Sequence, residues 1–138
     1  MQTQREVARM QIVVKKEKNE IIVKRYPGIP FVMTHMAAGD PETVFRVAEE
    51  CPNIIFDTSI TMTGERYIYR IHDDFWESDE NVVAAFRRIG CRRISFGSDY
   101  PFGNPSGDIQ RIRRLRLSDS EKELILGGNS YRLYMVKP

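Results

Sequence analysis

The stretch RRISFGSDYPFG, residues 92–103, runs two arginines into strand-forming residues and then into an acid that stands close to a proline. The sequence predicts a strand over residues 92–99, because this run is rich in residues that favour extended backbone and ends at a breaker. Residues 100–108, YPFGNPSGD, concentrate Pro, Gly, Asn and Ser, which is typical of a loop. Asp99 is therefore expected at the carboxyl end of a strand.

Two earlier runs have the same form. PFVMTH, residues 30–35, predicts a strand that ends near His35, and NIIFDTS, residues 53–59, predicts a second strand. The second run is almost continuously apolar up to Asp57, as expected for a strand covered on both faces. Segments of helical period separate the runs. This alternation is typical of βα units around a parallel sheet.

The helical segments carry recognisable start and stop signals. Asp40 followed by Pro41 predicts the start of one helix, and Ser118 with Glu121 three residues later forms a capping box. Residues 60–77 are expected to form an irregular loop with one helical turn. In residues 1–29 we favour helix over strand, although the β-branched residues there argue for strand. The expected helices span residues 41–51, 78–90 (with Gly90 as a left-handed cap), 108–115, 118–127 (stopping at Gly127 and Gly128) and 129–136.

Composition indicates an ordinary globular chain. Of its 138 residues, 41% are hydrophobic and 29% are charged, which excludes disordered and fibrous classes. No apolar run approaches the roughly 20 residues of a membrane span, and residues 1–10 lack the apolar core of a signal peptide. We therefore expect a cytoplasmic protein without a membrane partner. Cys51 and Cys91 lie far apart, outside any Cys-x-x-Cys spacing, so two reduced thiols are expected.

The charge of the chain gives little reason to expect a nucleic-acid partner. The 21 basic and 19 acidic residues leave a formal net charge of +2. The one local excess is RIRRLR, residues 111–116. Ile109, Ile112 and Leu115 recur at three-residue steps and so predict the buried face of a helix, with the arginines on its solvent side.

Polar residues end each of the three predicted strands: His35 ends the first, Asp57 and Ser59 the second, and Asp99 the third. In parallel βα architectures, ligands bind at the carboxyl ends of strands, so these side chains are expected to converge. A carboxylate and an imidazole suit zinc or a similar divalent ion.

Each of these residues also has a structural explanation. Asp99 can form a turn, His35 can be a hydrogen-bonded structural histidine, and Ser59 can cap the segment that follows its strand. His72 has no neighbouring histidine and is expected at the surface or, alternatively, in a loop over the pocket. Catalytic zinc usually takes about three protein ligands, and this chain shows no obvious full set.

The quoted stretch, together with PFVMTHMAAGDPE, PNIIFDTS and LSDSEKELILGGNSYRLY, resembles the C-terminal half of the amidohydrolase-related metal-dependent hydrolases. The branch that contains aminocarboxymuconate-semialdehyde decarboxylase and benzoate-type decarboxylases is the most similar in style. The resemblance implies an α/β fold, a partial (β/α)8 TIM barrel made of strands six to eight and the terminal helices. Residues 30–138 would form this half, and residues 1–29 a separate N-terminal segment.

The resemblance also implies roles for individual residues. His35, at the end of strand six, would act on metal-bound water or substrate, and Asp99, at the end of strand eight, would bind the metal and accept a proton. We therefore treat both as candidate catalytic and metal-binding residues. Asp57 and Ser59, at the end of strand seven, would line the substrate pocket with Tyr100. The implied cofactor is a divalent metal, zinc first and manganese second. The implied reaction is hydrolysis or decarboxylation of a small organic acid, amide or ester.

The sequence departs from the family in its histidines. The family's His-x-His pair on strand one and its histidine on strand five have no counterpart, since this chain contains only His35 and His72. A full barrel also needs about 250 residues. Two hypotheses follow. In one, another polypeptide completes a metal-dependent enzyme. In the other, the chain is a non-catalytic barrel half that self-associates or complements a partner chain.

Overall fold

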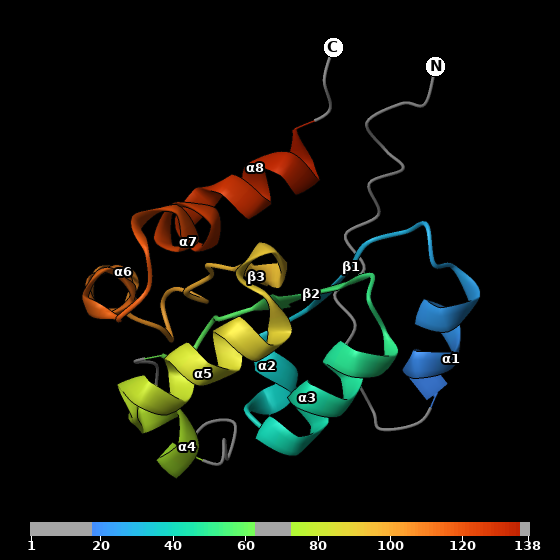
Figure 1. Cartoon of the computed structure of the whole chain (residues 1–138), viewed down its shortest axis with the longest axis horizontal. Helices are drawn as coiled ribbons and strands as arrows, with labels where there is room; N and C mark the ends of the chain where they lie inside the picture. The colour runs from blue at the N-terminus through green and yellow to red at the C-terminus, as the bar shows by residue number, and fades with distance from the viewer. Residues whose placement is uncertain (1–17, 63–72, 136–138) are drawn as a thin grey trace.

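The computed structural model describes residues 18–62 and 73–135 of the chain (Figure 1). Its centre is a parallel three-stranded sheet in the order β1–β2–β3. The predicted α/β class with parallel βα units is confirmed. The strands are β1 (Phe31–Met33), β2 (Ile54–Asp57) and β3 (Ile94–Ser95). The helices are α1 (Lys18–Arg25), α2 (His35–Ala38), α3 (Pro41–Glu50), α4 (Asp73–Glu77), α5 (Asp79–Ile89), α6 (Pro105–Arg114), α7 (Asp119–Glu123) and α8 (Asn129–Tyr134).

The register of the sheet places large side chains beside one another. Phe31 is paired with Ile54, while Phe56 stands between Met33 of β1 and Ile94 of β3. All five side chains are buried. Parallel strands of this kind need cover on both faces. In Figure 1, α2 to α5 lie below the sheet, α7 and α8 lie above it, and α6 lies beside it at the left.

The strands are shorter than predicted, and β3 shows why. Residues 91–93 form a 3₁₀ turn instead of extended backbone. Arg93 is held there because its guanidinium donates to the carbonyls of Ala48, Cys51 and Ile54, each at 2.8 Å. After Ser95, the N–H of Phe96 donates to the carbonyl of Ile125 at 2.9 Å, so β3 pairs with β2 only briefly. The prediction of a strand over residues 92–99 was therefore wrong in its length.

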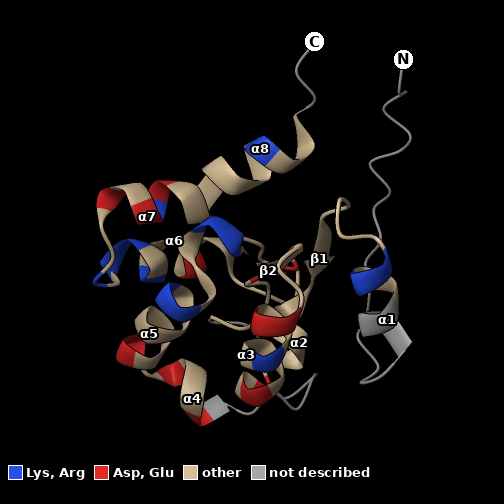
Figure 2. Ribbon diagram, turned by 45° about the vertical axis from the view of Figure 1, so that its right-hand side comes forward, with Lys and Arg blue, Asp and Glu red and all other residues tan. Residues whose placement is uncertain are grey.

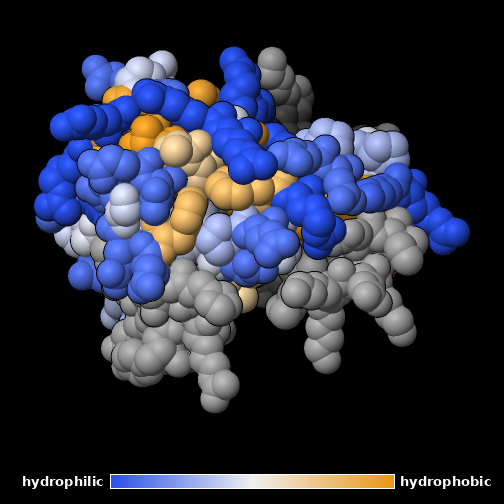
Figure 3. All heavy atoms as spheres, turned by 60° about the horizontal axis from the view of Figure 1, so that its bottom comes forward, coloured by the Kyte–Doolittle hydropathy of each residue, from blue (hydrophilic) through white to orange (hydrophobic). Residues whose placement is uncertain are grey.

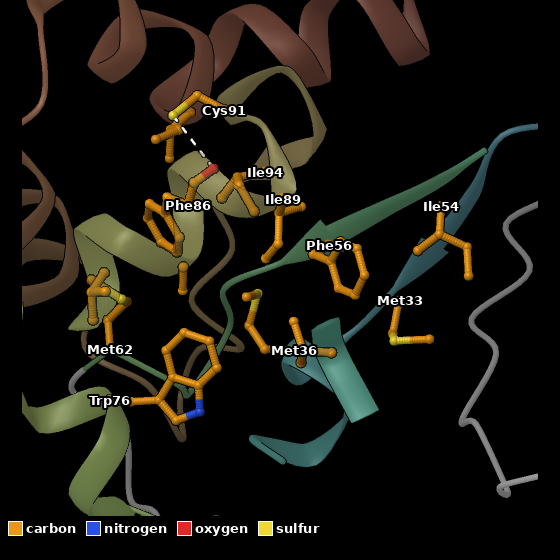
Figure 4. Packing of buried hydrophobic residues seen from close by; sticks show 14 of the residues in the cluster. Met33, Met36, Ile54, Phe56, Met62, Trp76, Phe86, Ile89, Cys91 and Ile94 are labelled. Carbon is orange, nitrogen blue, oxygen red and sulfur yellow. Dashed lines mark hydrogen bonds between the residues drawn. The ribbon is translucent and has the colours of Figure 1, made fainter. Parts of the chain in front are cut away.

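The buried core joins the sheet to the helices on both sides. Figure 4 shows Phe56 of β2 close to Met36, with Trp76 of α4 and Phe86 of α5 on the neighbouring helices. These four side chains are each 0% exposed. The indole N–H of Trp76 is satisfied by the carbonyl of Gly39 at 2.7 Å. Burying each of these side chains contributes about 1.5–3 kcal/mol to stability. Cys51 and Cys91 are buried free thiols, which agrees with the expected reduced state.

Helices α3 and α5 begin close to the predicted positions. Pro41 opens α3, and the hydroxyl of Ser78 caps α5 by accepting from the N–H of Asn81 at 3.2 Å. Asp40 occupies the N-cap position of α3, but its carboxylate accepts from the Thr43 hydroxyl and makes no cap bond to the backbone. After α5, Gly90 has a φ of 95°. This positive φ suits glycine, although its ψ of 120° differs from the predicted left-handed helical cap.

Helix α6 corrects the prediction for residues 111–116. It begins at Pro105, because the Asn104 side chain accepts from the N–H of Gly107 at 3.0 Å, whereas we expected a start at Asp108. Figure 2 shows the basic residues gathered on this helix. Arg113 and Arg114 are exposed as predicted, but Arg111 is only 7% exposed.

Arg111 is buried because its guanidinium donates hydrogen bonds to backbone carbonyls in the chain between β2 and α5. Its guanidinium donates to the carbonyls of Met62 and Trp76, each at 2.6 Å, and to the carbonyl of Glu77 at 3.0 Å. It also reaches the carboxylate of Asp79 at 2.9 Å. The buried face of α6 therefore includes Arg111, whereas Ile109, which we expected to be buried, is only half-buried.

The last part of the chain is a nearly continuous helical segment. The capping box is confirmed: Glu121 N–H donates to the Ser118 hydroxyl at 3.2 Å, and Ser118 N–H donates to the Glu121 carboxylate at 2.7 Å. The predicted stop at Gly127 and Gly128 was wrong. A π-helix spans Leu124–Gly128 and continues into α8.

The N-terminal and loop predictions are tested only in part. Helix α1 lies where helix was favoured, and Asn53 holds the chain after it by donating to the carbonyls of Tyr26 at 3.1 Å and Ile29 at 2.9 Å. Helix α4 is the expected helical turn within residues 60–77. Residues 1–17 and His72 lie outside the described residues, and the division at residue 30 stays a prediction.

The last observations concern one face of the molecule and the apolar character of its helices. An apolar strip bounded by hydrophilic side chains crosses the face shown in Figure 3. Within the described part of the chain, no helix combines the length and apolar character needed to cross a membrane.

Candidate functional site

Four of the five predicted site residues lie together at the carboxyl ends of the strands. Asp57 is the last residue of β2, and Ser59 follows it by two positions. His35 comes two residues after β1, and Asp99 comes four residues after β3. In order of contact, the connected side chains are Asp57, Ser59, His35 and Asp99. The expectation that these strand ends converge is therefore met by the geometry.

Asp57 and Ser59 form a tight local unit. Oδ1 of Asp57 accepts the backbone N–H of Ser59 at 2.8 Å and also accepts the Ser59 hydroxyl. The carboxylate thereby stabilises the turn that carries the chain off the end of β2. Ser59 is only 5% exposed, so its hydroxyl oxygen has a fixed position.

His35 faces this unit through one ring nitrogen. Nδ1 lies 3.0 Å from Oγ of Ser59 and 3.3 Å from the Ser59 carbonyl oxygen. The imidazole thus spans from the end of β1 to the chain that leaves β2. A hydrogen bond at each of these distances fixes the ring orientation.

An unusual backbone conformation places the imidazole. His35, Met36, Ala37 and Ala38 all have φ values between 45° and 58°, although none is a glycine. Each such residue costs about 1–2 kcal/mol in the left-handed region. The N–H of Gly39 closes the turn on the carbonyls of His35 at 3.0 Å and Met36 at 2.9 Å, and Met36 is fully buried. Strain of this kind in non-glycine residues is concentrated at functional sites.

His35 and Asp99 face each other across the site. Nε2 of His35 lies 4.0 Å from Oδ2 of Asp99, with side-chain exposures of 23% and 35%. The two groups are thus partly shielded from water and open to a small ligand. Asp99 also has a positive φ of 55°, and its carbonyl accepts the N–H groups of Phe102 at 2.9 Å and Gly103 at 3.2 Å. Asp99 is therefore a turn residue as well as a candidate ligand.

The distance between Nε2 of His35 and Oδ2 of Asp99 can be compared with the distance between two ligands of one metal ion. Zinc binds histidine nitrogen at about 2.0–2.1 Å and carboxylate oxygen at about 2.0–2.2 Å, so two ligands of one ion lie within about 4 Å of each other. The separation of 4.0 Å between Nε2 of His35 and Oδ2 of Asp99 is wider than the roughly 3.4 Å between two tetrahedral ligands of one ion at these bond lengths. The described residues contain no group of three or more His, Cys, Asp or Glu side chains able to hold a metal. The geometry therefore suits Asp99 as one ligand with His35 beside the ion, rather than both side chains on the same ion.

Tyr100 is placed differently from the other predicted pocket residues. It is 78% exposed, and the contacts that connect the other four residues do not include its side chain. Its role in a substrate pocket stays a prediction.

Two residues of the site were missed at the sequence level. Gly97 lies against Asp57, and a Cβ atom on Gly97 would stand 2.2 Å from Oδ2 of that carboxylate. Thr58 is fully buried between the neighbouring segments, where its N–H donates to the Ser95 carbonyl at 3.0 Å. A glycine within an otherwise strand-like run, as in SFGSD, can signal such a close approach.

The buried thiol of Cys91 is a poor candidate for a nucleophile. Burial, assisted by the nearby charge of Glu121, raises the pKa of Cys91 to about 11. Cys91 is therefore protonated at neutral pH, and a protonated thiol is a poor nucleophile and a poor metal ligand.

Comparisons with known proteins agree with this architecture. The sequence profile of the amidohydrolase family matches residues 18–136. A gamma-resorcylate decarboxylase from Polaromonas sp. (strain JS666) is 23% identical over 119 residues, which cover 81% of this chain and 36% of that protein.

Solved structures show the same fold. An amidohydrolase from Burkholderia multivorans with bound zinc superposes with a TM-score of 0.64 and 19% identity, over 83% of this chain and 47% of that one. A dihydroxybenzoic acid decarboxylase from Polaromonas sp. JS666, with manganese and the inhibitor 2-nitroresorcinol, gives a TM-score of 0.57 and 19% identity, over 82% of this chain and 36% of that one. The chain thus spans between about a third and a half of these relatives.

Proposed function

This chain belongs to the amidohydrolase family, and from that premise we propose that it supplies part of the catalytic site of a metal-dependent decarboxylase acting on a small aromatic acid. Its three strands correspond in this proposal to strands six, seven and eight of the family barrel. The pairing of His35 with Asp99 at the carboxyl ends of those strands is the observation that carries the proposal.

Decarboxylation requires a proton donor, and His35 can serve as one. Loss of carbon dioxide replaces a carbon–carbon bond by a carbon–hydrogen bond, so the substrate carbon must receive a proton. In our proposal, Nε2 of His35 delivers that proton, and the Asp99 carboxylate 4.0 Å away stabilises the protonated imidazole. The support for an aromatic acid comes from the relatives that are named as resorcylate and dihydroxybenzoate decarboxylases.

Asp99, with His35 beside it, is the proposed contribution of this chain to a metal centre. A divalent ion bound there would act as a Lewis acid and orient the substrate carboxylate. Relatives with bound zinc and manganese support a divalent ion without choosing between the two. Because catalytic zinc takes about three protein ligands, the remaining ligands are proposed to come from beyond the described residues.

The open edge of the sheet favours completion by further strands. β1 is bonded to β2 on one side, and no other strand among residues 18–62 and 73–135 pairs with its second edge. Such an edge presents unpaired N–H and C=O groups, which strongly favour association. We therefore propose that either a complementing polypeptide or a second copy of the chain covers β1. Self-association without catalysis is the second candidate function.

A reconstitution assay tests the proposal. The full chain is supplied with zinc or manganese and mixed with the part of the Polaromonas gamma-resorcylate decarboxylase that this chain does not match, and carbon dioxide release from 2,6-dihydroxybenzoate is measured. We expect release that is lost in His35→Ala and Asp99→Asn and kept in the exposed control Asp119→Asn.

Two results would count against the decarboxylase. Cleavage of amide or ester substrates without carbon dioxide release would assign hydrolysis instead. A stable homodimer that releases no carbon dioxide with or without the added half would favour the self-associating, non-catalytic reading.

A further inference from the structure

Ser59 stands between an acid and an imidazole, and this position determines which nitrogen of His35 carries hydrogen. We infer that Ser59 and Asp57 are positioning residues that hold neutral His35 in the Nδ1–H form, so that Nε2 is the reactive atom. The inference deepens the proposed function and rests on it for its catalytic meaning. The tautomer itself is a property of the chain alone.

The Ser59 carbonyl gives the first reason. A carbonyl oxygen can only accept a hydrogen bond, and it lies 3.3 Å from Nδ1 of His35. The contact is favourable only when Nδ1 carries the hydrogen. With the opposite tautomer, two lone pairs would face each other at this distance.

The Ser59 hydroxyl gives the second reason. An ionised carboxylate also accepts only, so the hydroxyl must donate its single hydrogen to Oδ1 of Asp57. Oγ of Ser59 then has only lone pairs to offer Nδ1 of His35, which lies 3.0 Å away. The carbonyl and the hydroxyl therefore require the same tautomer independently.

Neighbouring residues hold the acceptor groups of Asp57 and Ser59 in place. Asp57 is held from one side by the N–H of Ser59 at 2.8 Å and from the other by Gly97, which leaves no room for the carboxylate to shift. Thr58, between Asp57 and Ser59, is bonded through its N–H to Ser95 of β3. The acceptor positions are thus built into the sheet, as pre-organisation of a catalytic group requires.

The consequence lies on the other side of the ring. When Nδ1 carries the hydrogen, the lone pair of the neutral imidazole is on Nε2, which lies 4.0 Å from Oδ2 of Asp99. That distance is beyond a hydrogen bond, so the contacts of Nδ1 at 3.0 Å and 3.3 Å outweigh the preference of this carboxylate for an N–H. Nε2 can then take up a proton and return it to a substrate on the Asp99 side. An imidazole in the opposite form would present an N–H there and could not accept a proton.

Nitrogen NMR of the imidazole side chains tests the inference in the full chain without metal or substrate. Spectra are recorded near pH 8.5, well above the usual histidine pKa of about 6.5, so that the neutral ring is observed. His72→Gln identifies the His35 signals by removing those of the other histidine. We expect Nδ1 of His35 in the range of a protonated ring nitrogen and Nε2 in the range of an unprotonated one.

Two variants separate positioning from simple folding. Ser59→Ala removes the closer of the two acceptors and keeps the carbonyl, so it should increase the Nε2–H form in part. Asp57→Asn replaces the acceptor by an amide that can donate to Oγ of Ser59, which frees the hydroxyl to donate to Nδ1 and should also increase the Nε2–H form. Ser106→Ala, at an exposed serine of α6, should leave the His35 signals unchanged.

Either of two outcomes would overturn the inference: a wild-type chain already in the Nε2–H form, or unchanged His35 signals in both Ser59→Ala and Asp57→Asn. The wild-type spectrum decides even if a variant fails to fold. An inactive reconstituted enzyme with the Nδ1–H form intact would contradict the proposed decarboxylase but not the positioning role.

Discussion

Gly97 packs so closely against Asp57 that a Cβ atom at position 97 would lie 2.2 Å from Oδ2 of the Asp57 carboxylate. We therefore predict that Gly97→Ala displaces this carboxylate and weakens the contacts of Ser59 with His35. The expected loss of stability is about 1–3 kcal/mol, the usual cost of overpacking.

Urea unfolding measures the effect of Gly97→Ala. The matched control is Gly127→Ala, because a Cβ atom there would meet nothing within 4 Å. Alanine in that helical position should be neutral or stabilising. Equal stability of the two variants would contradict the close packing of Gly97.

Arg111 should be a major contributor to stability despite its charge. It is 7% exposed and donates to three carbonyls and to Asp79. Arg111→Ala removes the guanidinium that donates to the buried Met62 and Trp76 carbonyls, and we predict a loss of at least about 3 kcal/mol in urea unfolding. Arg113→Ala, at an exposed position of the same helix, should change stability by no more than about 0.5 kcal/mol. Similar losses in the two variants would refute the assigned role.

The left-handed turn after β1 predicts an unusual response to glycine. Ala38 is exposed and has a φ of 58°. Ala38→Gly removes the cost of this conformation. Because that cost exceeds the entropic penalty of the more flexible unfolded chain, the free energy of unfolding should rise by up to about 1 kcal/mol in thermal unfolding. The same exchange at Ala84, in the middle of α5, should instead cost about 0.5–1 kcal/mol. Destabilisation by both exchanges would argue against the left-handed turn.

Glu121 predicts a loss of stability in acid. The Glu121 carboxylate accepts a hydrogen bond from the backbone N–H of Ser118 and has Arg87 as a second partner. These contacts lower the pKa of the carboxyl from 4.5 to about 2. Because folding lowers this pKa, the stabilisation is complete above about pH 4.5 and is lost as the pH falls toward about 2. Glu121→Gln should be less stable than the wild type at pH 7, and the difference should shrink across that window.

Thermal unfolding at several pH values measures the Glu121 contribution. Ser106→Ala, at an exposed serine of α6 away from the capping box, should follow the wild-type curve. A difference between wild type and Glu121→Gln that stays constant from pH 7 to about 2 would disprove the linkage.

The sequence predicted those parts of the fold that depend on local pattern. The apolar runs before Asp57 and Asp99, the proline that opens α3 and the capping box at Ser118 are each signals within a few residues, and each lies where the structure has the element. The convergence of His35 with Asp99 was also predictable, because the carboxyl ends of parallel strands meet at one edge.

Features that depend on contacts distant in sequence were not predictable in the same way. Arg111 is buried because carbonyls from residues 62, 76 and 77 need donors, and nothing within RIRRLR marks that demand. The left-handed turn at residues 35–38 contains no glycine or asparagine that would signal it. The glycines at 127 and 128 suggested a stop, but packing continues the helix through them into α8.

Site-resolved metal binding tests the central claim, that Asp99 contributes a ligand to a metal centre beside His35. Mn²⁺ is titrated into the labelled chain, and paramagnetic broadening of the backbone amide signals is followed residue by residue. The account predicts that signals around His35 and Asp99 broaden first, and that Asp99→Asn removes this selectivity while Asp119→Asn preserves it. Broadening that begins elsewhere, or that persists around position 99 in Asp99→Asn, would contradict the account.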